Sequence, residues 1–264
     1  MRTVYMICNA HIDPVWQWEW EEGAAETLST FRVAADFCEE FDGFVFNHNE
    51  AMLYRWVEEY EPALFARIQR LVREGRWHIM GGWYLQPDCN MPSGESFIRQ
   101  IESGLSYFRE KFGVRPTTAV SVDAFGHTRG LVQILKKTGF DSYLFCRPWA
   151  SFQDLPEGVF DWVGYDGSRV MAYRINDSYA SPLGKAAEKI ETSARRSNAP
   201  IEVCLWGVGD HGGGPSRQDL QAIARLTERL REEGICLLHA TPEQYFAAEA
   251  AQNTSRPAFS GELN

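Results

Sequence analysis

Short runs of apolar, β-branched residues alternate along this chain with longer segments in which apolar residues recur at helical spacing. The first run, Val4 to Cys8, predicts a buried strand, and Gly23 to Glu40 predicts the helix that follows it. The alternation continues through most of the chain. We expect further strands at 44–46, 78–82, 118–122, 143–146, 203–208 and 235–239, a strand pair across 159–175, and helices within 50–74 and at 94–112, 131–138, 217–233 and 242–251.

The order of these elements predicts the fold class. Strands that alternate with helices are typical of an α/β fold with a parallel sheet and helices outside it. About seven such units in a chain of this length favour a closed or nearly closed barrel. The periodicity is lost over residues 253–264, so we expect a single barrel domain over residues 1–252.

Composition and charge narrow the classes of partner. The net charge is −10 and no run of Lys and Arg is dense enough to attract a phosphate backbone, so we expect no nucleic-acid partner. No apolar run approaches the roughly 18 residues of a membrane span, and no signal peptide is evident. The six Cys form no CxxC pair, which favours a reducing cytoplasm. Nine Trp favour a carbohydrate ligand, although several must fill the core.

Polar side chains follow several predicted strands at their carboxyl ends, where ligands gather in parallel α/β folds. His11 and Asp13 follow the first strand, and two side chains two residues apart on an extended segment point the same way. Asp123 follows the fourth strand, Asp88 comes after the third, and residues 209–215 follow a late one. One histidine and two aspartates are a ligand set that Zn²⁺ accepts in catalytic sites.

Each of these residues also has a structural interpretation. A lone Asp after a strand is most often the N-cap of the next helix, and Trp16 alone favours a core position. His127 reads as readily as a structural residue as a functional one. The glycines at 212–214 lack the ending of a phosphate loop, and they more simply allow close approach of the backbone to a ligand. The coincidence at several strand ends favours a site.

The chain resembles glycoside hydrolase family 38, the class II α-mannosidases, and especially their bacterial and cytosolic type. The resemblance runs over nearly the whole chain. Its motifs stand in the family's order at residues 9–16 (NAHIDPVW), 81–83 (GGW), 87–96 (PDCNMPSGES), 121–127 (SVDAFGH) and 209–215 (GDHGGGP).

The resemblance implies a fold and a set of roles. It implies a seven-stranded parallel (β/α) barrel of the glycoside hydrolase and deacetylase type. It also implies zinc bound by His11, Asp13 and Asp123, with Asp123 serving in addition as the catalytic nucleophile. Trp16 and Phe125 would line the mannose subsite. The other site residues that we expect are Asp210 as the general acid/base, and Arg147, His211, Asp177 and Asp88 in contact with the substrate.

Some positions depart from the family's pattern. One branch of the family has two adjacent aspartates in the acid/base motif, and the second is the acid. This chain has His211 at the second position. Both Asp210 and His211 therefore stay candidates for the general acid/base. Gln86 stands where related sequences often have Glu, and Tyr84 where many have Trp. The family's fourth zinc ligand is a His that follows the Gly-Glu-Leu segment, and the chain ends at Asn264. We therefore expect a fragment of a longer enzyme, with residues 253–264 starting the connection to downstream domains.

The expected function is a zinc-dependent retaining α-mannosidase that acts on terminal α-mannosides or oligosaccharides in the cytoplasm. Asp123 would attack the anomeric carbon, while Asp210, protonated near neutrality, would act as acid and then as base. A polysaccharide deacetylase-like metal hydrolase is one alternative, although its paired Asp and His-x-x-x-His motifs are not found. A second alternative is a metal- or sugar-binding fragment that is inactive alone. The mannosidic linkage stays open, because downstream loops and domains set that choice. The oligomeric state also stays open, since missing domains can leave an apolar face exposed.

Overall fold

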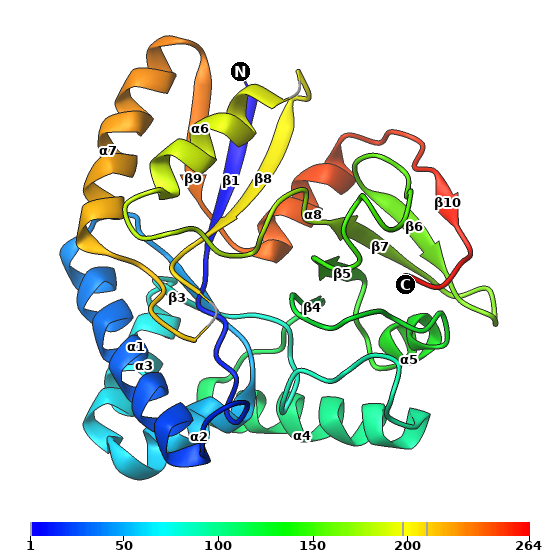
Figure 1. Ribbon diagram of the computed structural model, residues 1–264, viewed down its shortest axis with the longest axis horizontal. Helices are drawn as coiled ribbons and strands as arrows, with labels where there is room; N and C mark the ends of the chain where they lie inside the picture. Colours follow the sequence, from blue (N-terminus) through cyan, green and yellow to red (C-terminus); the bar gives the residue numbers. More distant parts are fainter. Residues whose placement is uncertain (1, 197, 210) are drawn as a thin grey trace. The chain divides into compact units, whose positions relative to one another are not determined.

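The computed structural model describes residues 2–196, 198–209 and 211–264 (Figure 1). The chain divides into two compact units, and each unit contains its own five-stranded sheet. The first unit comprises Met1–His48, Leu53–His78 and Ser178–Thr241, and the second comprises Asn49–Met52, Ile79–Asp177 and Pro242–Asn264.

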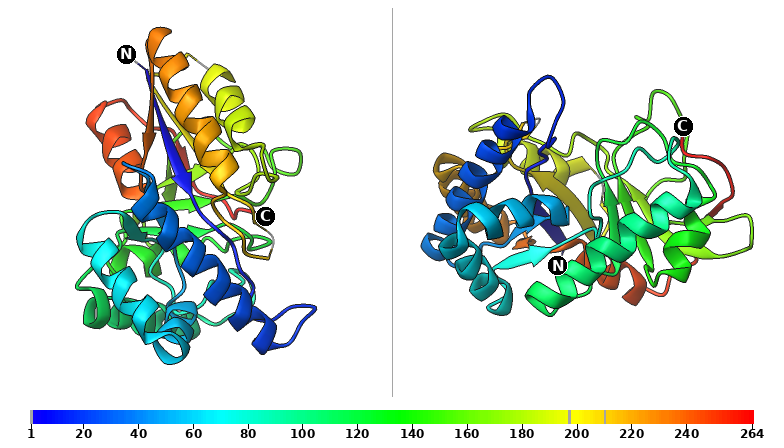
Figure 2. Two further views of the ribbon diagram at one scale, coloured as in Figure 1. Left: turned by 90° about the vertical axis from the view of Figure 1, so that its left-hand side faces the viewer. Right: turned by 90° about the horizontal axis from the view of Figure 1, so that it is seen from below.

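The first unit is a sheet with helices packed on it. α6 packs against β8, α7 packs against β9, and the two helices contact each other (Figures 1 and 2). The elements that lie wholly or mostly in this unit are β1 (Arg2–Cys8), α1 (Trp20–Glu40), β2 (Phe46–His48), α2 (Ala51–Tyr60), α3 (Pro62–Arg73), β3 (Trp77–Ile79), α6 (Ala186–Arg196), β8 (Ile201–Trp206), α7 (Arg217–Glu232) and β9 (Ile235–His239).

β1 is the central strand of this sheet. It pairs in parallel with β8 from Thr3 to Cys8. It also pairs in parallel with β9 from Arg2 to Met6, and it meets β2 at Cys8. Val4, Met6 and Cys8 are buried, as expected for a parallel strand that is covered on both faces. The residues that follow Cys8 therefore leave from the carboxyl end of the sheet, beside the ends of β2 and β8.

A buried amide fixes that end of the sheet. Asn47 on β2 is completely buried, and its Nδ2 donates hydrogen bonds to the carbonyls of Cys8, at 3.3 Å, and Ala240, at 3.0 Å. Both carbonyls lie at the point where a strand ends and its ladder of hydrogen bonds stops. The amide satisfies them without water, and it ties the ends of β1, β2 and β9 together.

The second unit contains a mixed sheet in the order β10-β6-β7-β5-β4. Its strands pair in parallel except for β6 and β7, which form an antiparallel hairpin. Its elements are α4 (Gly94–Phe112), β4 (Thr118–Ser121), α5 (Leu131–Lys137), β5 (Ser142–Phe145), β6 (Phe160–Val163), β7 (Arg169–Arg174), α8 (Pro242–Ala251) and β10 (Ala258–Phe259).

The sequence explains where α4 begins and ends. Ser93 is the N-cap, and its hydroxyl accepts a hydrogen bond from the Ser96 amide. Gly113 follows the last turn with φ of 70°, a left-handed conformation that glycine adopts without strain. Phe97, Ile101 and Phe108 are buried on one face of the helix. Burial of each such side chain stabilises the fold by about 1.5–3 kcal/mol.

Gly104, in the middle of α4, allows the helix to contact the backbone of the loop after β3. A Cβ at this position would overlap the carbonyl groups of Gly82 and Trp83 and would lie 2.6 Å from the Tyr84 amide nitrogen. We expect Gly104→Ala to lower the free energy of unfolding by about 1–3 kcal/mol, because backbone cannot move aside as a flexible side chain can. Gly94→Ala is the control, since its Cβ would only touch Ile134 at 3.8 Å. Equal denaturation midpoints for the two variants would contradict the argument.

The cysteines of this chain serve mainly as core residues. All six are free thiols, and five of them are buried. Burial raises the pKa of Cys38 to about 12 and that of Cys89 to about 11, so both thiols stay protonated near neutrality. Cysteines of this kind pack as small hydrophobic side chains rather than act as nucleophiles.

The mixed α/β fold with parallel sheets is confirmed. The described strands form two sheets of five, and a closed seven-stranded barrel is not shown among them, so the barrel stays a prediction. Several strand ends differ from their predicted positions, and β8 is Ile201–Trp206 rather than 203–208. The second strand is Phe46–His48 rather than 44–46, because its last two residues are polar yet buried. The third ends at Ile79, since Gly81 and Gly82 have φ of 77° and 76°, which a strand does not allow.

α6 was not predicted. Its buried face consists of Ala186, Ile190, Ser193 and Ala194, with one large apolar side chain among them, so the apolar periodicity is weak. The helical segment predicted within 50–74 consists of α2, which ends at Tyr60, and α3, which begins at Pro62. None of the helices in the described part of the chain has both the length and the apolar composition that a bilayer span requires.

Candidate functional site

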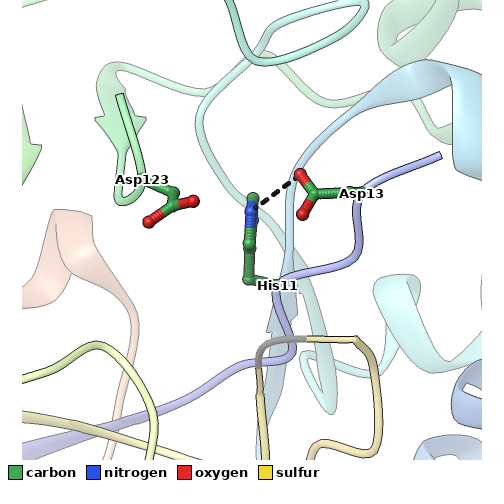
Figure 3. Close-up of side chains that lie close together, drawn as sticks. All are labelled: His11, Asp13 and Asp123. Atoms are coloured by element: carbon green, nitrogen blue, oxygen red, sulfur yellow. Dashed lines mark ion pairs between the residues drawn. The ribbon is translucent and has the colours of Figure 1, made fainter. Parts of the chain in front are cut away.

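His11 and Asp13 lie together in the loop that follows β1. The Nε2 atom of His11 is 3.2 Å from Oδ1 of Asp13, and Figure 3 shows the two side chains facing each other. His11 is 6% exposed, whereas the side chain of Asp13 is 34% exposed. The two side chains are therefore in contact, with the imidazole near the protein interior and the carboxylate toward solvent.

The backbone around His11 is fixed by hydrogen bonds within the first unit. Asn9 Nδ2 donates to the carbonyls of Tyr179, at 3.0 Å, and Trp206, at 3.3 Å. The amide of Gly212 donates to the His11 carbonyl at 3.0 Å. The rings of His11 and Tyr179 meet edge to face, with centroids 5.4 Å apart. These contacts hold the imidazole in one orientation, which a metal ligand requires.

Trp18 joins this loop to the segment that contains His211, and sequence reasoning did not single it out. Its Nε1 donates to the Asp13 carbonyl at 3.1 Å, and its ring lies over that of His211 with centroids 3.6 Å apart. Nε2 of His211 is 3.3 Å from Oε1 of Glu22. Trp16 meets Trp18 edge to face and is itself 63% exposed. The available signal was the repeat of Trp at positions 16, 18 and 20.

The predicted general acid Asp210 lies outside the described residues. Its neighbours after β8 are described, and the glycines there contact protein. Gly213 donates its amide to the Thr30 hydroxyl at 2.9 Å, and Gly214 exchanges two backbone hydrogen bonds with Val208. Close packing of this loop on α1 explains the glycine run.

Asp123 lies two residues beyond the end of β4 in the second unit. Arg147 donates to its Oδ1 from Nε at 2.9 Å and from Nη2 at 2.8 Å. The guanidinium carbon also lies 4.8 Å from the ring centre of Phe125 and 5.0 Å from that of Trp149. Two hydrogen bonds from one charged guanidinium fix the orientation of this carboxylate. The Phe125 ring is 74% exposed, as a surface that stacks on a ligand must be.

A chain of hydrogen bonds supports the end of β4 from the other side. The backbone N–H of Val122 donates to Oε1 of the Gln86 side chain at 2.9 Å. The backbone N–H of Gln86 donates in turn to Oε1 of Glu50 at 3.1 Å. Glu50 is buried and has φ of 69°, an uncommon conformation for a non-glycine residue. Gln86 stands where related sequences often have Glu. Its side-chain amide oxygen accepts the Val122 hydrogen bond as a carboxylate oxygen would.

The two remaining carboxylates are exposed. Oδ1 of Asp88 accepts a hydrogen bond from the Asn90 amide at 3.0 Å, which is the local turn contact that aspartate often makes. Asp177 is exposed, and its backbone carbonyl accepts a weak hydrogen bond from the thiol of Cys146. Their roles in substrate contact stay predictions.

The geometry gives each unit a distinct part of the chemistry. The first unit provides an imidazole and a carboxylate in contact, and the second provides a carboxylate that receives two hydrogen bonds from an arginine. The chain over residues 1–262 matches the model of the glycosyl hydrolases family 38 N-terminal domain. The chain belongs to glycosyl hydrolase family 38. The resemblance expected from the five motifs is thereby confirmed.

Similar proteins agree with this family 38 membership. Alpha-mannosidase G of Dictyostelium discoideum is 31% identical over 268 residues, which cover 98% of this chain and 24% of that protein. Human alpha-mannosidase 2C1 is 30% identical over 267 residues, with 99% of this chain and 25% of that protein covered. The chain thus spans about a quarter of the length of these relatives.

A solved structure shows the same fold. The crystal structure of an alpha-mannosidase from Enterococcus faecalis V583 superposes with a TM-score of 0.87 at 19% identity. The match covers 100% of this chain and 31% of that one. This family 38 chain therefore has the fold of part of a longer enzyme.

Proposed function

We propose that this chain carries the nucleophile and most of the metal site of a retaining α-mannosidase that hydrolyses terminal α-mannosides. The observation that carries the proposal is the Asp123 carboxylate, which receives two hydrogen bonds from Arg147 in a chain of family 38. A carboxylate that is partly exposed and hydrogen-bonded to a guanidinium suits the role of a glycosidase nucleophile. The substrate class comes from the mannosidases that the chain resembles at 30–31% identity.

His11, Asp13 and Asp123 would hold a zinc ion. Each offers one ligand atom, a ring nitrogen or a carboxylate oxygen, and zinc accepts both. The burial of His11 and the contacts of its ring suit a ligand held in advance of metal binding. When bound, zinc would supply positive charge that holds two hydroxyls of the sugar and stabilises the transition state.

The two carboxyl groups of a retaining glycosidase have separate tasks. Asp123 would attack the anomeric carbon, forming a bond from its carboxylate oxygen to that carbon as the bond to the leaving oxygen breaks. The general acid would give its proton to the leaving oxygen. It would then take a proton from a water molecule whose oxygen bonds to the anomeric carbon as the bond from that carbon to Asp123 breaks. Asp210 is our first candidate for the acid, and His211, beside Trp18 and Glu22, is the alternative.

The sugar would rest against exposed aromatic rings. Trp16 and Phe125 are each more than half exposed, and such rings stack on the apolar faces of sugars. Arg147 would hold Asp123 and also lie within reach of the bound ring. The side chains that we propose for further substrate contacts are His211, Asp88 and Asp177.

A comparison of two substrates tests the proposed function against the deacetylase alternative. We expect the full-length protein to release nitrophenol from nitrophenyl α-mannoside and to leave an acetylated sugar polymer intact. The reason is that a carboxylate nucleophile attacks an anomeric carbon, whereas a deacetylase directs water at an acetyl carbon. Release of acetate without release of nitrophenol would overturn the proposal.

A further inference from the structure

His127 is a fully buried histidine four residues after Asp123, and the proposed function gives it no role. Its backbone is fixed from two sides. Its amide donates to the Leu263 carbonyl at 2.7 Å, and the Leu263 amide donates to the His127 carbonyl at 3.0 Å. On the other side His127 forms a bridge with Cys89 in the loop after β3. Its ring therefore projects from a rigid segment.

Both nitrogens of the His127 ring have a partner. Nε2 lies 2.8 Å from the Arg147 carbonyl oxygen, and Nδ1 lies 2.6 Å from the Tyr143 hydroxyl. A carbonyl oxygen only accepts, so Nε2 must carry the hydrogen in this contact. Nδ1 then accepts from Tyr143 if the ring is neutral. Burial lowers the pKa of His127 to about 4, which agrees with a neutral ring near neutrality.

Arg147 is held at two points. Its carbonyl is held by His127, and its guanidinium donates both of its hydrogen bonds to Oδ1 of Asp123. The guanidinium carbon lies 4.8 Å from the ring centre of Phe125 and 5.0 Å from that of Trp149, within the range of cation–π contacts. A shift of the Arg147 backbone would therefore move the guanidinium relative to Asp123. Arg147 thus contacts His127 through its carbonyl and Asp123 through its guanidinium.

We propose that His127 is a positioning residue, which holds the Arg147 backbone and thereby sets the pairing of Arg147 with Asp123. The inference rests on the proposed role of Asp123 as nucleophile, and its test can fail while that role stands. Loss of the hydrogen bond from Nε2 would leave the Arg147 carbonyl unpaired in the interior. The backbone would move to find another donor, and Asp123 would lose its fixed orientation.

Two substitutions separate the contacts of the ring. In His127→Gln the amide nitrogen reaches about the position of Nε2 and can donate to Arg147. In His127→Asn the shorter amide reaches only about the position of Nδ1 and can pair with Tyr143. We expect His127→Asn to lower kcat by about 10- to 100-fold with KM within about threefold, and His127→Gln to restore most of kcat. Equal kcat for both variants and the parent would overturn the inference.

A double-mutant comparison tests whether the effect passes through Arg147. In an Arg147→Ala background, His127→Asn should cause little further loss of kcat, because the guanidinium that it positions is gone. A full further loss would show that His127 acts by another route. His239→Asn is the matched control, since burial lowers the pKa of that histidine also to about 4 and it lies on β9 in the other unit. It should lower stability without changing kcat.

Two further measurements keep the outcomes distinct. If His127→Asn does not fold, nitrogen NMR of the parent labelled at histidine still tests the idea. A neutral ring protonated at Nε2 is expected, and one protonated at Nδ1 would overturn the inference. Formation of a glycosyl-enzyme by the parent and not by Asp123→Asn shows that the proposed function itself holds in the same experiment.

Discussion

Replacing Asp123 with asparagine in the full-length enzyme is expected to lower kcat on nitrophenyl α-mannoside on the order of 10⁴-fold. The amide is neutral and a poor nucleophile, so the bond to the anomeric carbon cannot form at a useful rate. The hydrogen bonds from Arg147 would also lose the charge that strengthens them. The measurement is steady-state kinetics together with mass spectrometry of the protein after incubation with an activated fluorosugar.

A covalent sugar adduct, trapped with the fluorosugar, decides whether the Asp123 carboxylate is the nucleophile. The parent should gain the mass of one sugar, and the Asp123→Asn variant should gain none. Asp36→Asn is the control, because Asp36 lies on α1 and pairs with Arg67 in an exposed ion pair, which contributes little to stability. A sugar adduct on the Asp123→Asn protein would show that the nucleophile is another residue.

Removal of the metal is expected to have the second largest effect. Chelation of the full-length enzyme should abolish measurable activity, and added zinc should restore it. His11→Ala should lower the bound zinc and kcat/KM by at least about 100-fold, since the variant loses its nitrogen ligand and leaves Asp13 without its nearest partner. Metal content by elemental mass spectrometry and activity should fall together.

The control for this experiment is another histidine of the same unit. His78 lies on β3, away from the loop after β1, and His78→Gln should keep both zinc and activity. Full activity in the chelated parent, at a metal content near zero, would defeat the assignment of a metal to His11, Asp13 and Asp123. Equal zinc content in the His11→Ala variant and the parent would remove His11 alone from the ligand set.

The sequence predicted local structure best where one physical signal dominated. The bounds of α4 follow from the Ser93 cap, the apolar face and Gly113, and all three are visible in the chain. The end of β3 was misplaced because Gly81 and Gly82 occur in an apolar run, and only the structure shows their positive φ. The sequence did not predict α6, because its buried face consists mostly of small residues, which give only a weak apolar periodicity.

The candidate site divides in the same way. The contact of His11 with Asp13 follows from a spacing of two residues, which the chain displays directly. The contact of Trp18 with His211 joins residues far apart in sequence, and no local pattern predicts it. The same is true of the hydrogen bond from Val122 to Gln86, which depends on how the loop after β3 folds back onto β4.

The pairing of His127 with Leu263 also bears on when this region can fold. The two residues lie about half the chain apart, so the loop that carries Asp123 gains this support only after the residues between His127 and Leu263 have been synthesised. Translation proceeds at roughly 5–20 residues per second, and that interval lasts from several seconds to tens of seconds. During that interval, the nascent chain contains β4 and His127 but lacks Leu263, which pairs with His127. A pause in translation before Leu263 would prolong the exposure of this loop to chaperones and proteases.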